Sequence, residues 1–272
     1  MALGAVLSAG RRTPYDGEGM KILALKLVVT PLFIAAATAM ARRFGAGVGG
    51  WLAGLPLTSG PVSAFLALEQ GPTFAAHAAV GTLLGLIAVT AFCVAYARVA
   101  DRLGWPLSTL VGLGAFVLMT GLLADLSVSL ALALGAVVAS LVLGVVMIAT
   151  SRNPAYVRAP RWDVPLRMTA ATAVVLALTA VASTLGAQLS GLVSTVPVFA
   201  STMAAFSHRF GGARAATQLL RGVVVGSFAF ASFFLVVGVC VERLGLLPTY
   251  ALATIAALGV NAVSLLLIER AG

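Results

Sequence analysis

Long apolar runs divide this chain, and they constrain its fold more than any other feature of the sequence. A helical run of about 20 residues crosses the roughly 30 Å hydrocarbon core of a bilayer. In lipid every backbone N–H and C=O needs a partner inside the protein, which a helix supplies within its own segment. The runs are continuously apolar and lack the alternating pattern of lipid-facing strands, so we expect helices and not a β-barrel.

The composition excludes a soluble domain, because only 9% of the residues are charged and the mean hydropathy is +1.08. We therefore predict an all-α integral membrane protein with about nine transmembrane helices. The expected spans are Ile22–Ala41, Val48–Leu68, Thr73–Ala97, Trp105–Ala124, Ser127–Thr150, Pro165–Leu185, Ser190–Ser207, Ala213–Val241 and Leu246–Ile268.

The positive charges indicate how the chain is oriented. The net charge is +9, and most Lys and Arg residues between Arg42 and Arg270 fall on one side of the expected spans. By the positive-inside rule that side is cytoplasmic, with the N-terminus outside and the C-terminus inside the cell inner (plasma) membrane. The charges form no single patch, so we expect the lipid bilayer as a partner and no nucleic acid.

Residues 1–20 fit no targeting signal. The apolar stretch Ala2–Ala9 is too short to span, and Arg11 and Arg12 follow it instead of preceding it. We expect a disordered N-terminal tail here, which opposes the predicted orientation because it is basic. The alternative is a mis-assigned start, with Met20 as the first residue.

The chain aligns with itself when it is shifted by the 141 residues that separate Pro56 from Pro197. A match at one fixed period indicates duplication. The same shift places Phe65 on Phe206, Gly71 on Gly212, Gly81 on Gly222, Gly85 on Gly226, and Asp101-Arg102-Leu103-Gly104 on Glu242-Arg243-Leu244-Gly245.

The duplication predicts two inverted four-helix repeats. Residues 21–125 form the first repeat, 126–164 a linking helix and cytoplasmic loop, and 165–270 the second repeat. Four crossings return the chain to its starting side, so the linking helix inserts the second repeat upside down. Inverted repeats are a recurring plan of secondary transporters, because one unit in two orientations can supply inward-open and outward-open states.

Spans two and seven are interrupted at equivalent positions by Gly, Pro, Ser and Thr. Proline lacks an N–H and crowds the carbonyl one turn earlier, so backbone groups are freed at membrane depth. In transporters such broken helices bind the substrate or coupling ion, although closely packed, kinked helices are the alternative. The predicted substrate-binding residues are Pro56, Thr58, Ser59, Gly60, Pro61, Ser63, Thr195, Pro197, Ser201 and Thr202.

Few ionisable groups lie in or near the spans, where charge is costly. Glu69, His77 and Asp125 are the candidate ionisable contributors to a site. For Glu69 and His77 the alternative is solvation at the membrane interface, and Asp125 could instead cap the fifth span. His208 falls at the end of span seven, where a solvated loop is expected.

No metal, cofactor or enzyme activity is expected. Cys93 and Cys240 lie in different spans, without CxxC spacing or a nearby His, and are interpreted as packing residues. The sequence has no HExxH, Walker-type or GxSxG motif. The GxxxG pairs at Gly81–Gly85 and Gly222–Gly226 predict close helix packing inside one chain, and a homo-oligomer is left open.

One part of the second repeat resembles the small four-span inner-membrane family that includes GlpM. The resemblance rests on Ser190–Thr202 and on the Gly-led turn Gly211–Thr217, followed by a long apolar helix. It implies a tandem, inverted duplication of two such units. The first copy departs from it at Leu57-Thr58 and at Thr73, where Arg214 stands in the second. The family carries over no catalytic residue.

The repeats favour a secondary-transporter-like permease for a small solute that the sequence does not identify. The alternative is a non-transporting membrane scaffold, or an accessory subunit in envelope or polysaccharide assembly. A permease needs a water-filled cavity at the interrupted helices, whereas a scaffold does not.

Overall fold

The computed structural model describes residues 28, 32, 35–56, 59–148, 164–166, 168–169, 172–173 and 195–271. Of a few helical residues, among them Pro61 and Glu69, only the backbone is described. Regular structure within these ranges is entirely helical, which confirms the predicted all-α class there. The helices are α3 (Ala46–Ala53), α4 (Ser59–Gln70), α5 (Pro72–Val99), α6 (Trp105–Leu123), α7 (Leu130–Met147), α10 (Val198–Leu244) and α11 (Leu246–Ala271).

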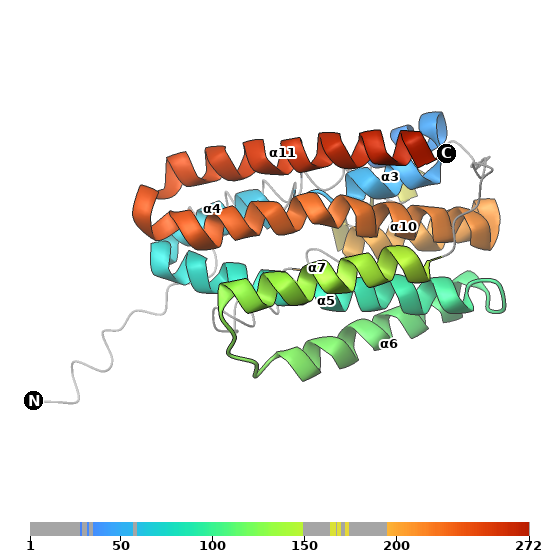
Figure 1. Ribbon diagram of the computed structural model, residues 1–272. Coiled ribbons are helices and arrows are strands. Elements are labelled where there is room, and N and C mark those ends of the chain that lie inside the picture. Colours follow the sequence, from blue (N-terminus) through green and yellow to red (C-terminus); the bar gives the residue numbers. More distant parts are fainter. Residues whose placement is uncertain are drawn as a thin grey trace, which may run out of the picture.

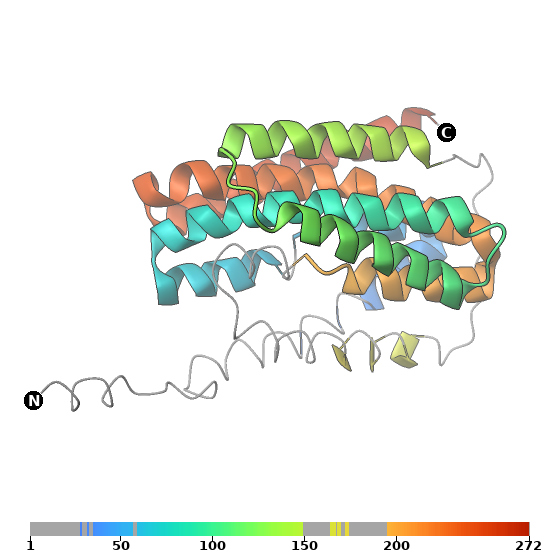
Figure 2. The ribbon, with the colours of Figure 1, turned by 90° about the horizontal axis from the view of Figure 1, so that it is seen from below.

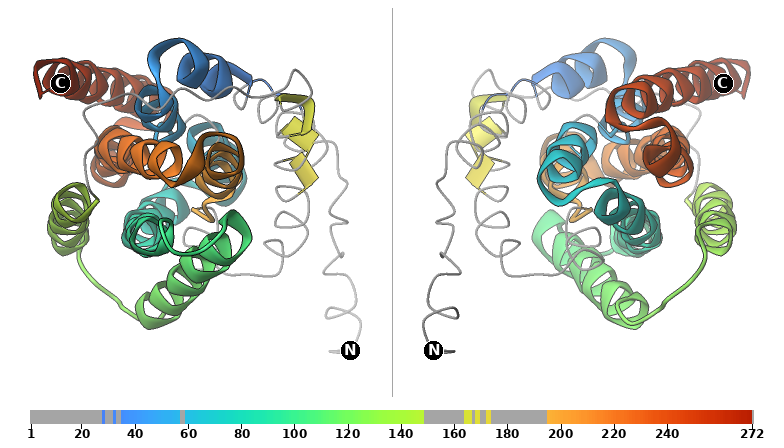
Figure 3. Two further views of the ribbon diagram at one scale, coloured as in Figure 1. Left: turned by 90° about the vertical axis from the view of Figure 1, so that its right-hand side faces the viewer. Right: turned by 90° about the vertical axis from the view of Figure 1, so that its left-hand side faces the viewer.

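The long helices form one elongated bundle and run roughly along a common axis (Figures 1 and 2). Viewed along that axis, α5 and α10 lie near the centre, with α3, α6, α7 and α11 around them (Figure 3). Small residues and buried apolar side chains occur throughout α5 and α10, as expected for helices with neighbours on several sides.

Helices that align when the sequence is shifted on itself run in opposite directions. The chain passes from α5 into α6 at one end of the bundle, and from α10 into α11 at the opposite end (Figure 1). The second part of α10 is therefore antiparallel to α5, and α11 is antiparallel to α6.

Two glycines at aligned positions have the same unusual backbone conformation. Gly71 joins α4 to α5 with φ 89° and ψ 168°, and Gly212 lies inside α10 with φ 76° and ψ 179°. Glycine adopts positive φ without the steric cost that a Cβ imposes. Gly212 thus divides α10 into a first stretch, residues 198–211, and a second stretch, residues 213–244.

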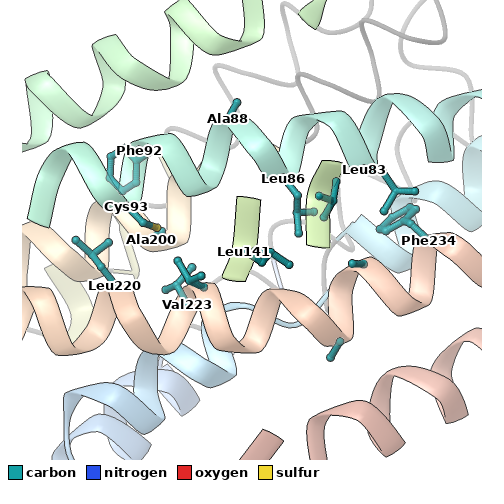
Figure 4. Close-up of a cluster of buried hydrophobic side chains, with 14 of the residues drawn as sticks. Leu83, Leu86, Ala88, Phe92, Cys93, Leu141, Ala200, Leu220, Val223 and Phe234 are labelled. Carbon is teal, nitrogen blue, oxygen red and sulfur yellow. The ribbon is translucent and has the colours of Figure 1, made fainter. Parts of the chain in front are cut away.

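The apolar core lies where α5, α7 and α10 meet (Figure 4). Phe92 and Cys93 of α5, Leu141 of α7 and Leu220 of α10 are all completely buried there. Cys93 therefore occupies a packing position, as predicted from its surroundings in the sequence.

A side chain of α10 holds the end of α7. The Arg221 guanidinium donates to the carbonyl oxygen of Val145, and to that of Ile148 at 2.9 Å. The last carbonyls of a helix have no partner within it, so this contact satisfies two of them. The contact also connects α7, which has no counterpart in the sequence alignment of the two halves, to the second half of the chain.

Five helices within the described ranges have the length and apolar composition to cross a membrane: α5, α6, α7, α10 and α11. They fit a membrane-embedded protein. Their outward faces carry large apolar side chains such as Leu118, Val146 and Leu247, which are 67%, 76% and 85% exposed. Patches of this kind are expected where a surface faces lipid.

The expected spans differ from the helices in several places. The span expected at Val48–Leu68 consists of two short helices, α3 and α4, because the chain leaves the helical path between them. The spans expected at Ser190–Ser207 and Ala213–Val241 share one helix, α10, with Gly212 as its break. Most of the spans expected at Ile22–Ala41 and Pro165–Leu185 lies outside the described residues.

The fifth span begins later than expected. Ser129 is the N-cap of α7, and its hydroxyl accepts a hydrogen bond from the Leu132 N–H at 3.3 Å. The interpretation of Asp125 as the cap is therefore wrong, because a capping side chain must stand directly before the first helical turn. Asp125 lies in the preceding turn and is exposed.

Candidate functional site

The first interruption lies between α3 and α4, near the middle of the bundle's long axis (Figure 1). The chain turns at Gly54 after α3 ends, and Pro56 is buried. The helix restarts with a hydrogen bond of 2.8 Å from the Gly60 N–H to the Pro56 carbonyl oxygen. The predicted break in this span is thus confirmed, whereas the predicted site residue Thr58 lies outside the described residues.

The second interruption lies just before α10. Thr195, Val196 and Pro197 are not helical, and α10 begins at Val198. Here the helix starts with a hydrogen bond of 2.7 Å from the Ser201 N–H to the Pro197 carbonyl oxygen. Ser201 and Pro197 align with Gly60 and Pro56, so both repeats resume the helix in the same way.

Each interruption packs against the long helix of the other repeat. A Cβ added to Gly54 would lie 2.7 Å from the Gly226 carbonyl carbon, so these two backbones nearly touch. Gly85 and Thr195 align with Gly226 and Gly54, and a Cβ on Gly85 would lie 2.8 Å from Cγ2 of Thr195. The two contacts therefore involve residue pairs that align under the same sequence shift.

The GxxxG glycines of α10 make these contacts within the chain, as predicted. A Cβ on Gly222 would lie 2.8 Å from the Trp51 nitrogen of α3 and would also meet the Gly47 carbonyl oxygen. A Cβ on Gly226 would meet the Trp51 carbonyl oxygen. Because Gly222 and Gly226 have no side chains, α3 can approach α10 closely at these two positions.

The predicted hydroxyls do not all face one point. The Ser63 hydroxyl lies 2.7 Å from the Tyr250 hydroxyl of α11. The Ser201 hydroxyl donates to the Val198 carbonyl oxygen of its own helix at 3.1 Å. Thr195 is buried, whereas Ser59 and Thr202 are half-buried. The two interruptions therefore provide several polar groups, some of which already have partners within the bundle.

The remaining predicted site residues lie elsewhere or are not described. Gly60 is buried against the ring of Phe233, and of Pro61 only the backbone in α4 is described. His77 is exposed in the first turns of α5, away from the middle of the bundle. The side chain of Glu69 lies outside the described residues, so its role as a contributor stays a prediction.

Sequence reasoning missed a hydrogen-bonded group at the end of the bundle where α5 meets α6. The hydroxyl of Tyr96, a completely buried residue of α5, lies 3.2 Å from Nδ1 of His208 in the first stretch of α10. Tyr96 also hydrogen-bonds Thr109 of α6, and the Asp101 carboxylate acts on His208 electrostatically. His208 is helical and half-buried, so the expected solvated loop is wrong.

A second contact supports the same junction. The Arg209 guanidinium lies over the ring of Trp105, 5.9 Å from its centroid, at the start of α6. In the other half the positions aligned with Tyr96 and His208 are the apolar residues Val237 and Ala67. The repeat alone therefore contained no signal for this junction.

Buried polar atoms without a partner recur on α6 and α11. Among the described residues, Oγ1 of Thr120 and Oδ1 of Asn261 have no hydrogen-bond partner, and these two positions also align under the sequence shift. Asn261 is only 3% exposed. Close to it, Trp51 donates from Nε1 to the Ser264 hydroxyl at 2.9 Å. An unpaired buried polar atom is costly, so these positions mark where the bundle could take up water or another polar group.

In the part of the chain that the structure describes, no group of three or more His, Cys, Asp or Glu residues could hold a metal ion. Comparison of the chain with protein-family models, with curated proteins and with solved structures finds no match.

Proposed function

We propose that this protein is a secondary-transporter-like permease that carries a small solute across a cell inner membrane. Its helices would form two inverted repeats of four spans each, and α7 would join the repeats as a ninth span. The observation that carries the proposal is the pair of aligned interruptions, each of which restarts a helix with the same hydrogen bond from Gly60 or Ser201 to a proline carbonyl.

The antiparallel course of equivalent helices supports the inverted relation (Figure 1). So does the exchange of contacts, in which Gly54 meets Gly226 and Thr195 meets Gly85. In this arrangement the interruptions lie near the pseudo-two-fold axis, where the two repeats can exchange conformations. The resemblance to GlpM-like proteins remains part of the proposal, as an origin by fusion of two such units.

The chemistry available at the interruptions is that of uncharged polar groups. Pro56 and Pro197 have no backbone N–H to donate, and Ser59 and Thr202 add hydroxyls. Such groups can replace part of the water around a small polar solute. The helix N-termini at α4 and α10 also point into this region.

The proposal predicts water at the interruptions. Single cysteines at Ser59, Ser201 and Thr202, in a chain whose Cys93 and Cys240 are replaced by Ala, are expected to react with a small water-soluble thiol reagent. The reason is that a permease must open a wet path to these positions from at least one side. Labelling in intact cells and in inside-out vesicles measures the reaction and its sidedness.

Two control positions show how much labelling to expect where water is absent. A cysteine at Leu83, which is completely buried in the core, and one at Leu118, which faces outward at 67% exposure, should both stay unlabelled. If Ser59, Ser201 and Thr202 are as silent as these two while exposed loop positions react, the interruptions serve packing only. The scaffold or accessory subunit would then replace the permease.

A further inference from the structure

The segments that follow the two interruptions are tied down at opposite ends of the bundle by different chemistry. In α4 the tie is the hydrogen bond of 2.7 Å between the hydroxyls of Ser63 and Tyr250. In the first stretch of α10 it is the contact of 3.2 Å between His208 and Tyr96. Of these four side chains, only that of histidine ionises close to neutral pH.

The second tie can form with a histidine that donates through Nδ1. Which of the two groups donates across the 3.2 Å between the Tyr96 hydroxyl and Nδ1 of His208 depends on the protonation of the imidazole ring. An imidazolium always carries that Nδ1 hydrogen, and its charge makes the bond about twice as strong as a neutral one.

The groups around His208 include one negative charge. Tyr96 faces His208 from α5, Thr109 lies behind Tyr96 on α6, and Asp101 contributes a carboxylate from the turn between these helices. The one cation next to it in sequence, Arg209, lies over the rings of Trp105 and Phe210, at 5.9 and 5.7 Å from their centroids. Protonated His208 would thus be attracted to both Tyr96 and Asp101.

We propose that His208 is a proton-binding site, and that its protonation closes the end of the bundle at the α5–α6 turn. The inference rests on the proposed permease and deepens it by naming the proton as the coupling ion. The imidazolium holds the first stretch of α10 against Tyr96, and loss of the proton weakens that tie and lets this end open. The hydrogen bond between Ser63 and Tyr250 at the other end contains no group that titrates near neutral pH. Only the end of the bundle at the α5–α6 turn would therefore open and close with pH.

A distance measurement across this junction tests the inference without knowledge of the solute. Spin labels on cysteines at Arg102 and Arg209, in liposomes, report the separation of the α5–α6 turn from the first stretch of α10 by pulsed electron paramagnetic resonance. The short-distance population is expected to dominate at about pH 5.5 and to fall several-fold by about pH 8, because the ordinary pKa of histidine lies between these two values.

The repeat supplies a matched control pair. Arg243 and Leu68 align with Arg102 and Arg209, and all four residues are exposed. Labels at Arg243 and Leu68 span the Ser63–Tyr250 tie, and their distances are expected to be the same at both pH values. An equal response of both pairs would overturn the inference, because it would point to a general effect of pH.

Two substitutions identify the group responsible. His208→Gln keeps an amide donor but cannot titrate, so the distances between the Arg102 and Arg209 labels should no longer depend on pH. Tyr96→Phe keeps the ring and loses the hydroxyl, so the short-distance population should fall at both pH values. A pH response that persists in His208→Gln, its absence in the parent, or an unchanged distribution in Tyr96→Phe contradicts the inference.

The outcomes separate this inference from the permease itself. If the cysteines at the interruptions react but the distances across the junction do not depend on pH, the proton site alone is overturned. Unreactive cysteines at Ser59 and Ser201 together with a pH-dependent junction would overturn the permease and the proton's role as its coupling ion, and would leave His208 as the proton-binding site that controls the junction.

Discussion

Replacing Gly222 or Gly226 by alanine is expected to destabilise the folded protein by about 3 kcal/mol, the upper part of the usual range for overpacking. The added methyl group would meet the carbonyl oxygen of Gly47 or of Trp51. Backbone atoms cannot rotate away as a side chain can, so α3 would have to separate from α10. Thermal unfolding of the purified variants in detergent, compared with the parent, measures the loss.

Two other glycines provide the control. Gly114 in α6 and Gly135 in α7 are helical and have nothing within 4 Å of an added Cβ. Alanine at either position should leave stability within about 1 kcal/mol of the parent, on the stabilising side, because alanine is the better helix former. If Gly114→Ala and Gly222→Ala lose stability equally, close approach of α3 is not what the α10 glycines provide.

Alanine at Gly85 is expected to cost about 1–3 kcal/mol, and a second substitution, Thr195→Gly, should restore most of that loss. Here the three atoms nearest to the added Cβ are Oγ1, Cγ2 and Cβ of Thr195, so removing that side chain relieves the clash. The double variant then has a glycine at position 195, as the other repeat has at Gly54. A double-mutant cycle on unfolding temperatures and free energies measures the coupling between the two positions.

The same rescue should fail in the other half. Thr195→Gly is expected to leave the loss caused by Gly226→Ala unchanged, since the Gly226 contact is with the backbone of α3. A coupling energy near zero between Gly85 and Thr195, or a rescue of Gly226→Ala by Thr195→Gly, would contradict the reciprocal packing of the two repeats.

Helices α5 and α6 could be predicted because each is one continuous apolar run that begins beside a glycine and a proline. Gly71 and Pro72 mark the start of α5, and Gly104 and Pro106 mark the start of α6. The break after α3 was also visible, because Pro56 cannot continue a helical hydrogen-bond ladder. These are local effects, and local sequence suffices to indicate them.

The junction of Tyr96 and His208 could not be predicted in the same way. These residues lie 112 positions apart, and they meet only because the first stretch of α10 packs beside α5 and α6. The N-cap of α7 was misjudged for a related reason. Asp125 and Ser129 are both good capping residues, and which one caps depends on where the chain completes its turn.

The hydrogen-bond partners of the serine hydroxyls could not be predicted from the sequence either. Ser63 and Ser201 stand in similar interrupted segments, yet Ser63 bonds a tyrosine of α11 and Ser201 bonds its own backbone. A serine hydroxyl accepts either partner, so tertiary packing decides between them.

Sidedness of two aligned positions tests the central claim, that the second half of the chain is inserted upside down. Arg102 and Arg243 are both exposed, each beside the turn between two long helices. On the Cys-free background, single cysteines at these positions are treated with a membrane-impermeant thiol reagent in intact cells and after permeabilisation. We expect the cysteine at 243 to be labelled in intact cells and the one at 102 only after permeabilisation. Labelling of both from the same side would contradict it.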